Sequence, residues 1–316
     1  MINFFTKVTK KPVLDKITHK HNILMIGSCF SNEIGKKFTS EGFSTYINPF
    51  GILYNPISIA ECLDRIAKKQ FFNSNDLIYN NGYYYLFAAH GDYRAKEKET
   101  LLEIINNVIL KAHEYLKKTD YIFITLGTSW TYWYTPLNMM LGNCHKLDNR
   151  LIERRLIPYN DIATKFYETV ILLKNTFGDR CHIIFTVSPI RHWKEGYRDN
   201  LISKSHLHLA IEELQHMDES LDYFPSYEIV MDTLRDYRFY TEDMLHINST
   251  AVDYIWEVFS DVYFSAETKE LNTQFRKLWL MQNHRAVNPD SEMYQRHLDK
   301  IERTKKELQP YTNLQL

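Results

Sequence analysis

Short apolar runs alternate with longer amphipathic stretches along most of this chain. An uninterrupted apolar run is typical of a strand buried on both faces of a sheet, whereas apolar positions three and four residues apart indicate a helix. Because parallel strands need crossover connections, this alternation favours a mostly parallel sheet covered by helices on both faces. We therefore predict an α/β protein with three α/β/α layers. The predicted strands are 23–26, 43–47, 121–126, 182–187 and 228–231, and the predicted helices begin near 56, cover 97–117, end near 177, and cover 201–217 and 249–264.

Three segments depart from this alternation. Asn81-Gly82 stands between β-rich flanks, a sequence typical of a hairpin turn. Residues 131–157 have no clear period and are interpreted as an irregular insertion. Residues 266–310 carry many charges at helical spacing and no strand pattern. We therefore predict two parts, a domain over 1–265 and a helical C-terminal extension over 266–316.

The composition argues against several classes of protein. Lys and Arg total 38 and Asp and Glu total 39, which gives a net charge of −1 with both signs interspersed. Neither nucleic acid nor a membrane surface is therefore expected as a partner. Residues 1–21 contain no continuous apolar segment, which argues against a signal peptide or a membrane span. The four cysteines lie far apart and resemble reduced thiols, so we predict a cytoplasmic protein.

The most informative chemistry follows the first predicted strand. Gly27 allows a tight turn, and Ser28 and Cys29 follow it at the start of a helix. In open parallel sheets ligands bind beyond the carboxyl ends of the strands, where the next helix directs its positive end. A nucleophile there would be exposed, and the pKa of a thiol beside a helix N-terminus and a histidine is expected to fall. The alternative is structural, with Ser28 or Ser31 capping the helix and Cys29 packed inward.

A histidine that could act as a base follows the last predicted strand. Asp243 and His246 are three residues apart, so in a helical turn the carboxylate can reach one ring nitrogen while the other points toward a nucleophile. Asp179 and His182 have the same spacing. His182 begins a strand, however, and therefore lies at the sheet edge opposite Cys29, whereas Asp243 and His246 are expected on the same edge as Cys29.

These motifs resemble those of the GSCFA family, whose name reproduces the Gly-Ser-Cys-Phe sequence found here, with Ser31 at the family's alanine position. The resemblance covers about residues 20–265. It includes the sequences at 48–51 (NPFG), 125–130 (TLGTSW), 143–146 (NCHK), 186–192 (TVSPIRH), 234–240 (LRDYRFY) and 243–246 (DMLH). That family is grouped with the SGNH hydrolases, α/β esterases and acyltransferases with a flavodoxin-like sheet, so the resemblance implies this fold and acyl-ester chemistry.

Site roles follow from the four sequence blocks of those hydrolases. The last block, Asp-x-x-His, implies that Asp243 orients His246 and that His246 is the base. The second block implies that the backbone N–H of Gly51 points into an oxyanion hole. The third block departs, because Ser129 stands where those hydrolases have an asparagine donor, and Asn143 or His145 is the alternative donor. The register of the first block places Cys29, rather than Ser28, at the nucleophile position, although Ser28 stays open.

Substrate contacts are predicted from side chains that follow strands on the same edge. Trp130 lies in an aromatic cluster that could stack on a sugar, although such rings are also common in half-buried sheets. Arg191 and His192 would bind a substrate carboxylate or supply a second base, or Arg191 would brace its loop. His145 is assigned to the substrate side as well. Cys144-His145 has no second ligand pair, so no metal and no other cofactor is expected.

The sequence thus predicts an acyl-ester hydrolase with a small-molecule or glycan ester as substrate. An acylated glycan is slightly favoured by the aromatic content. Two alternatives remain, an O-acyltransferase acting on a sugar hydroxyl and a noncatalytic glycan-binding or scaffold protein, which would explain the altered third block. The oligomeric state is left undecided.

Overall fold

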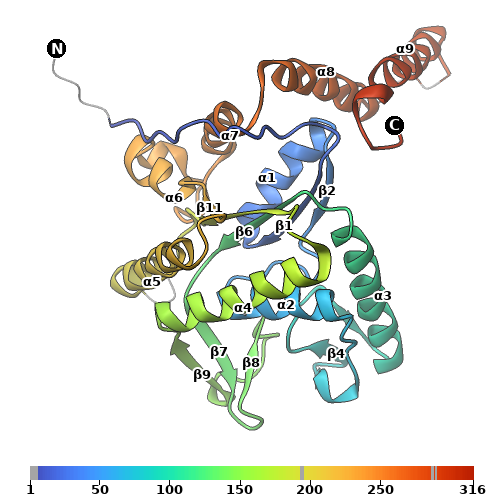
Figure 1. The fold of residues 1–316 in the computed structure, drawn as a ribbon. Coiled ribbons are helices and arrows are strands. Elements are labelled where there is room, and N and C mark those ends of the chain that lie inside the picture. Colours follow the sequence, from blue (N-terminus) through green and yellow to red (C-terminus); the bar gives the residue numbers. More distant parts are fainter. Residues whose placement is uncertain (1–5, 193–195, 286–287, 289) are drawn as a thin grey trace.

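A five-stranded parallel sheet forms the centre of the protein (Figure 1). The computed structural model describes residues 6–192, 196–285, 288 and 290–316. Along the sheet the strands run in the order β11-β10-β6-β1-β2. Their bounds are β1 Asn22–Gly27, β2 Ser44–Ile47, β6 Tyr121–Leu126, β10 His182–Val187 and β11 Asp222–Tyr223.

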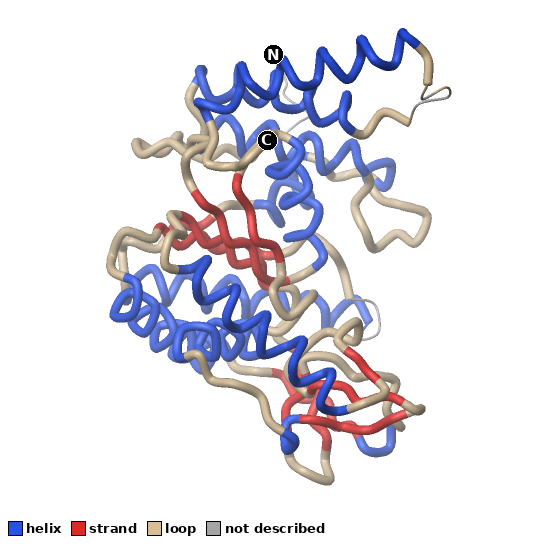
Figure 2. Tube along the Cα trace, turned by 90° about the vertical axis from the view of Figure 1, so that its right-hand side faces the viewer, coloured by secondary structure: helices blue, strands red, loops and turns tan. Residues whose placement is uncertain are grey.

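Helices cover both faces of this sheet, and Figure 2 shows the strands between the two helical layers. One layer contains α1 (Cys29–Ser40) and α7 (Ser249–Tyr263), and the other contains α2 (Pro56–Lys68), α3 (Lys98–Leu116), α4 (Tyr159–Phe177) and α5 (Gly196–Met217). The three-layer α/β/α prediction is therefore confirmed.

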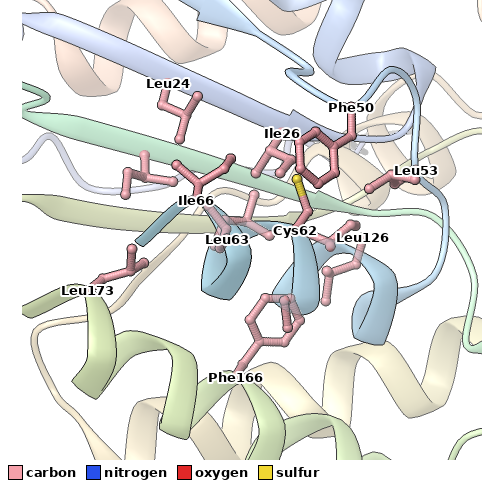
Figure 3. Packing of buried hydrophobic residues seen from close by; sticks show 14 of the residues in the cluster. Leu24, Ile26, Phe50, Leu53, Cys62, Leu63, Ile66, Leu126, Phe166 and Leu173 are labelled. Atoms are coloured by element: carbon pink, nitrogen blue, oxygen red, sulfur yellow. The ribbon is translucent and has the colours of Figure 1, made fainter. Parts of the chain in front are cut away.

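Alternate residues of β1 pack into the two different cores, because successive side chains of a strand point to opposite faces. Leu24 and Ile26 join the core beneath α2, whereas Ile23 and Met25 join the core beneath α1 and α7. Figure 3 shows Leu24 and Ile26 beside Cys62, Leu63 and Ile66 of α2. Burial on both faces explains why the sequence of this strand is apolar without interruption.

The strand order places a topological switch point between β1 and β6. Counted along the chain, the sheet strands follow the order 2-1-3-4-5, so the connections leave β1 and β6 toward opposite sides. Crossovers from neighbouring strands diverge there and leave a crevice at the carboxyl ends. Cys29 follows β1 and Thr128 follows β6, so both residues lie at this crevice.

Local signals at the start of α2 are confirmed. Pro56 is its first residue, and the Asn55 side chain accepts a hydrogen bond of 2.8 Å from the Ser58 N–H. The hairpin prediction is also confirmed, with Asn81 and Gly82 at positive φ between β3 (Leu77–Asn80) and β4 (Tyr83–Leu86). The short strand β5 (Arg94–Ala95) extends the hairpin into a small sheet.

Two predictions of secondary structure are wrong. Residues 228–231 are helical, within α6 (Ser226–Glu228) and a π-helical segment Ile229–Thr233, and β11 is instead the fifth strand. A short buried apolar run does not distinguish strand from helix. The predicted irregular insertion is a three-stranded antiparallel sheet with the order β8-β7-β9. Its strands are β7 Trp130–Tyr134, β8 Met139–Leu141 and β9 Ile152–Leu156.

The C-terminal segment is helical, as predicted, with α8 (Ala266–Gln282) and α9 (Glu292–Leu308). Phe275 of α8 stacks on His19 with ring centroids 4.5 Å apart. A Cβ atom at Gly42 would lie 2.3 Å from Phe275, so α8 packs closely on the turn after α1. These helices lie at the end of the molecule remote from β7–β9 (Figure 1).

Candidate functional site

The turn after β1 requires glycine and brings Cys29 to the start of α1. Gly27 has φ +134°, and a Cβ atom there would lie 2.1 Å from the Thr125 carbonyl oxygen. Ser28 is the N-cap of α1, and its Oγ accepts a 3.3 Å hydrogen bond from the Phe30 N–H. Ser28 is only 1% exposed, whereas Cys29 is partly exposed.

Asn48, to which sequence reasoning assigned no role, holds this turn in place. Its Oδ1 accepts a 2.8 Å hydrogen bond from the Gly27 N–H, and its Nδ2 donates one of 2.6 Å to Asn32 Oδ1. Asn48 has φ +45°, a conformation that asparagine tolerates better than most residues. The only available signal was its place in the Asn-Pro-Phe-Gly sequence.

Replacing Asn48 with alanine is expected to destabilise the protein by about 2–4 kcal/mol, because the buried Gly27 N–H loses its acceptor and a Cβ-bearing residue without a side-chain oxygen must keep positive φ. Urea unfolding followed by circular dichroism measures this. Asn48→Gly is the matched control, since it loses the same hydrogen bonds without backbone strain and should be about 1 kcal/mol less destabilised. Equal stability of the two variants would contradict the strain argument.

Asp243 and His246 form the hydrogen-bonded pair expected from their spacing. His246 Nδ1 donates a 2.6 Å hydrogen bond to Asp243 Oδ2. The pKa of Asp243 lies well below its ordinary value because the backbone N–H and the ring of His246, the Leu245 N–H and the Thr241 hydroxyl all stabilise the carboxylate. An ionised Asp243 favours the tautomer that carries its proton on Nδ1, and in that neutral tautomer Nε2 has the lone pair.

This pair sits in a loop, not in the helical turn assumed from the spacing. A bridge between Tyr240 and Ile247 closes the loop, and Met244 has φ +57°. The Asp243 Oδ1 atom accepts 2.9 Å hydrogen bonds from the N–H groups of Leu245 and His246. The Asp243 carboxylate therefore stabilises the loop through its backbone N–H groups and also orients the His246 ring.

Cys29 and His246 line one cavity of about 470 Å³ at the carboxyl edge of the sheet. Predicted residues that line the same cavity are Trp130, Asn143, Arg191 and His192. His182, in contrast, begins β10 at the opposite edge, as expected. Position in the topology thus separated the two Asp-x-x-His pairs correctly.

Five predicted site residues do not line this cavity: Ser28, Gly51, Ser129, His145 and Asp243, which is connected to it through its hydrogen bond to His246. The Gly51 N–H donates a 2.8 Å hydrogen bond to the Asn48 carbonyl, so in this structure it is held within its own turn. Ser129 is fully buried, and its Oγ donates to the Ser203 carbonyl at 3.2 Å. His145 is buried with Nε2 at 2.7 Å from the Leu86 carbonyl oxygen, and burial lowers its pKa to about 4.

Asn143 is better placed than Ser129 to donate a hydrogen bond to a substrate. Its Oδ1 accepts a 3.0 Å hydrogen bond from the His145 N–H. Its Nδ2 meets no protein acceptor among the described residues, and the side chain lies on the cavity wall. The alternative that the sequence left open for the third block is therefore the one that the geometry supports.

The expected fall in the pKa of Cys29 is wrong in its net direction. Burial raises the pKa of the thiol, and this outweighs the N–H groups of Cys29 and Phe30, which bind the thiolate, and the charge of Lys204, which favours it. The helix N-terminus acts as expected, but the sequence did not reveal how deeply the sulfur is enclosed. At neutral pH the resting group is a thiol, so attack requires a base.

Side chains around the cavity hold one another in place. Arg154 lies 3.8 Å above the ring of Trp130, whose Nε1 donates to the Asp199 carbonyl. Arg191 lies 4.9 Å from the ring centroid of Tyr240, and His192 packs edge-on against Tyr54. Arg191 thus contacts an aromatic ring next to the Asp243–His246 loop and also lines the cavity.

A second and larger cavity, about 720 Å³, contains none of the predicted site residues. The two cavities use opposite faces of β7, because Trp130 and Tyr132 line the first whereas Thr131 and Trp133 line the second. Of these two cavities, only the smaller one is lined by both Cys29 and His246.

Among the described residues, no group of His, Cys, Asp and Glu side chains could hold a metal ion. In the same part of the chain, no helix is both long and apolar enough to cross a membrane.

Comparison with solved structures finds distant likenesses. A carbohydrate esterase family 2 enzyme with a carbohydrate-binding domain, from Corynascus thermopiles (Myceliophthora fergusii), aligns with a TM-score of 0.41 and 11% identity, over 83% of this chain and 68% of that one. A DUF4886 family protein from Bacteroides uniformis ATCC 8492 aligns with a TM-score of 0.40 and 12% identity, over 94% of this chain and 98% of that one.

No curated protein matches the sequence. The model of the GSCFA family matches residues 22–259, which include the β1 turn, the cavity and the Asp243–His246 loop but exclude α8 and α9. This chain therefore belongs to the GSCFA family.

Proposed function

We propose that this protein is an acyl-ester hydrolase in which Cys29 is the nucleophile and His246, oriented by Asp243, is the base. The observation that carries the proposal is the shared cavity. Cys29 and His246 line it together, and Asp243 binds Nδ1 of His246, which leaves Nε2 as the ring nitrogen that can accept a proton. Ser28 is less suitable because it is buried and its Oγ caps α1.

His246 relays one proton in each of the two half-reactions. Nε2 takes the thiol proton as Sγ attacks the ester carbonyl carbon, and the carbonyl oxygen becomes an oxyanion. Collapse of the tetrahedral intermediate breaks the bond to the alcohol oxygen, which receives the proton from Nε2. Water then attacks the Cys29 thioester with His246 again as base, releasing the acid and restoring the thiol.

Two donors near Cys29 suit the oxyanion. The N–H of Cys29 is at the first position of α1, where helix N–H groups lack internal partners. The Asn143 amide, which lines the same cavity, supplies a second donor. The earlier candidates Gly51 and Ser129 would have to exchange their present partners, Asn48 and Ser203, to take part.

The cavity walls favour an acylated sugar as substrate. Tyr54, Trp130 and Tyr132 supply aromatic surface, which binds the apolar faces of sugar rings. Asn143, Arg191 and His192 supply polar groups for hydroxyl or carboxylate oxygens. A volume of about 470 Å³ is within the range of small-molecule sites.

The test is the intact mass of the protein after brief incubation with a panel of activated esters and a fluorophosphonate. We expect one acyl group per wild-type chain and none on Cys29→Ala. Ser28→Ala is the matched control, because it loses a helix cap worth about 1 kcal/mol but keeps the thiol. An adduct that persists in Cys29→Ala and disappears in Ser28→Ala would assign the nucleophile to Ser28. Absence of any adduct on the folded protein would favour a noncatalytic binding protein.

A second candidate is an acyltransferase that uses the same residues. The cysteine nucleophile favours it, because a thioester passes its acyl group readily to an alcohol. If the thioester persists in water but is lost quickly when sugars are added, with acyl sugar as product, transfer is the reaction. Loss at the same rate without sugar indicates hydrolysis.

A further inference from the structure

Lys204 is a fully buried lysine at the carboxyl edge of the sheet. It projects from α5 and is 1% exposed. Its Nζ donates hydrogen bonds of 2.7 Å to the Gly127 carbonyl and 2.6 Å to the Ser188 carbonyl. These carbonyls lie just beyond the ends of β6 and β10. Lysine is almost never fully buried without an ionic partner, so this position calls for an explanation.

No carboxylate among the described residues forms an ion pair with Lys204. Burial lowers its pKa to about 7, and the charge of Cys29 acts in the opposite direction. The two carbonyl oxygens also favour the ammonium form, because it donates to both of them. The other titratable neighbours are His208, one turn along α5, and Tyr227, whose ring centroid lies 5.8 Å from Nζ. Neither supplies an anion at neutral pH.

The two carbonyls that bind Lys204 belong to residues that lie next to the wall of the Cys29 cavity along the chain. Thr128 follows Gly127 and lines the cavity with Cys29, and Ile190 does so two residues after Ser188. The buried ammonium therefore lies close to the cavity wall but is not among the groups that line the cavity. Among the described residues, Cys29 is the group whose ionisation would give Lys204 an anionic partner.

Other groups that face Cys29 do not supply such a buried charge. Glu33, on the same helix, opposes thiolate formation. Tyr54 interacts with Cys29 from the loop before α2. His246, Arg191 and His192 line the cavity itself, where substrate and water also enter.

We propose that Lys204 is a positioning residue whose ammonium, locked between the carbonyls of Gly127 and Ser188, is the buried counter-charge of the Cys29 thiolate. When the thiol proton moves from Sγ to His246 Nε2, the negative charge forms on sulfur beside a positive charge already in place. Lys204 makes no bond to substrate, and its proton count does not change. This role rests on the proposed function, because it assigns Cys29 as the reacting group.

The experiment is the rate at which iodoacetamide alkylates Cys29 across pH 5.5–10, followed on the Cys29 peptide by mass spectrometry. Lys204→Met should alkylate about tenfold more slowly than wild type near pH 6, where Lys204 is an ammonium. The difference should vanish above about pH 9, where Lys204 is neutral. A purely structural role would change the rate without this dependence on pH.

Two further variants separate charge from packing. Lys204→Gln keeps two N–H donors for the carbonyls but lacks the charge, so it should behave like Lys204→Met. Lys174→Met removes a lysine of α4 that pairs with Asp218. Lys174 does not line the cavity, so this variant should match wild type. A ratio between folded Lys204→Met and wild type that stays the same at all pH values overturns the proposal.

A further measurement leaves Lys204 in place, in case neither variant folds. In a chain carrying His246→Ala and His192→Ala, the alkylation profile should keep a shoulder near pH 7, from the titration of Lys204. A single step overturns the proposal. Both measurements read the thiol and not ester chemistry, so a protein that fails to form an acyl adduct can still show the Lys204 effect, and the two failures are distinguishable.

Discussion

Replacing His246 with alanine should slow acylation of Cys29 by about 10³-fold at pH 7, within the usual range for a general base. Burial raises the pKa of the Cys29 thiol, so little thiolate exists at neutral pH without a proton acceptor. The measurement is the rate of adduct formation with an activated ester, read by intact mass. Asp243→Asn should also slow it, because an amide no longer requires the proton on Nδ1.

The dependence on pH distinguishes a base from a structural support. As pH rises toward the thiol pKa, thiolate forms without His246, so the deficit of His246→Ala should shrink. A deficit of the same size at pH 7 and pH 10 would show that His246 acts by another route. His182→Ala is the matched control, since His182 belongs to the second Asp-x-x-His pair and lies at the opposite edge of the sheet. It should acylate at the wild-type rate.

Positions governed by local sequence were predictable, as α2 shows. Asn55 and Pro56 mark its start because capping and the fixed φ of proline act within a few residues. The uninterrupted apolar run of β1 likewise reported burial on two faces. Ile229 and Val230 gave an equally apolar run, but they lie in helical turns, since burial alone does not specify the backbone conformation.

The candidate site was predictable where topology alone decides. Cys29 and His246 both follow strands, so a parallel sheet brings them to one edge. The oxyanion donors were not predictable in this way, because backbone N–H groups take whichever acceptor the tertiary fold supplies. Ser129 bonds to Ser203, which lies 74 residues away, and no local pattern indicates that contact.

Lys204 stands out in the sequence by its position in α5, but it was not predicted as a site residue. It shares the apolar face of α5 with Leu207, Ile211 and Leu214, at spacings of a helical core stripe. A lysine in such a stripe either extends its ammonium to solvent along a buried stem, or buries the ammonium as well, which requires specific partners. Only the two carbonyl partners of its Nζ distinguish the second case from the first.

Replacing Gly27 with alanine should destabilise the protein more than any other substitution considered, by at least about 4 kcal/mol, and abolish acylation. The residue would have to keep φ +134°, and its Cβ would lie 2.1 Å from the Thr125 carbonyl oxygen. That oxygen belongs to the neighbouring strand β6, so the clash is with backbone and no side chain can move aside. Urea unfolding measures the change.

Gly178→Ala is the matched control for the backbone term. Gly178 also has positive φ, at +86°, but nothing lies within 4 Å of a Cβ atom there, so its variant should lose only the backbone strain of about 1–3 kcal/mol. If Gly27→Ala costs no more than Gly178→Ala, the close approach of β1 to β6 is not what requires glycine. The same contact that excludes a side chain at Gly27 also sets the turn after β1. That turn places Ser28 at the N-cap of α1 and Cys29 in the cavity wall, so the fold and the site depend on the same glycine.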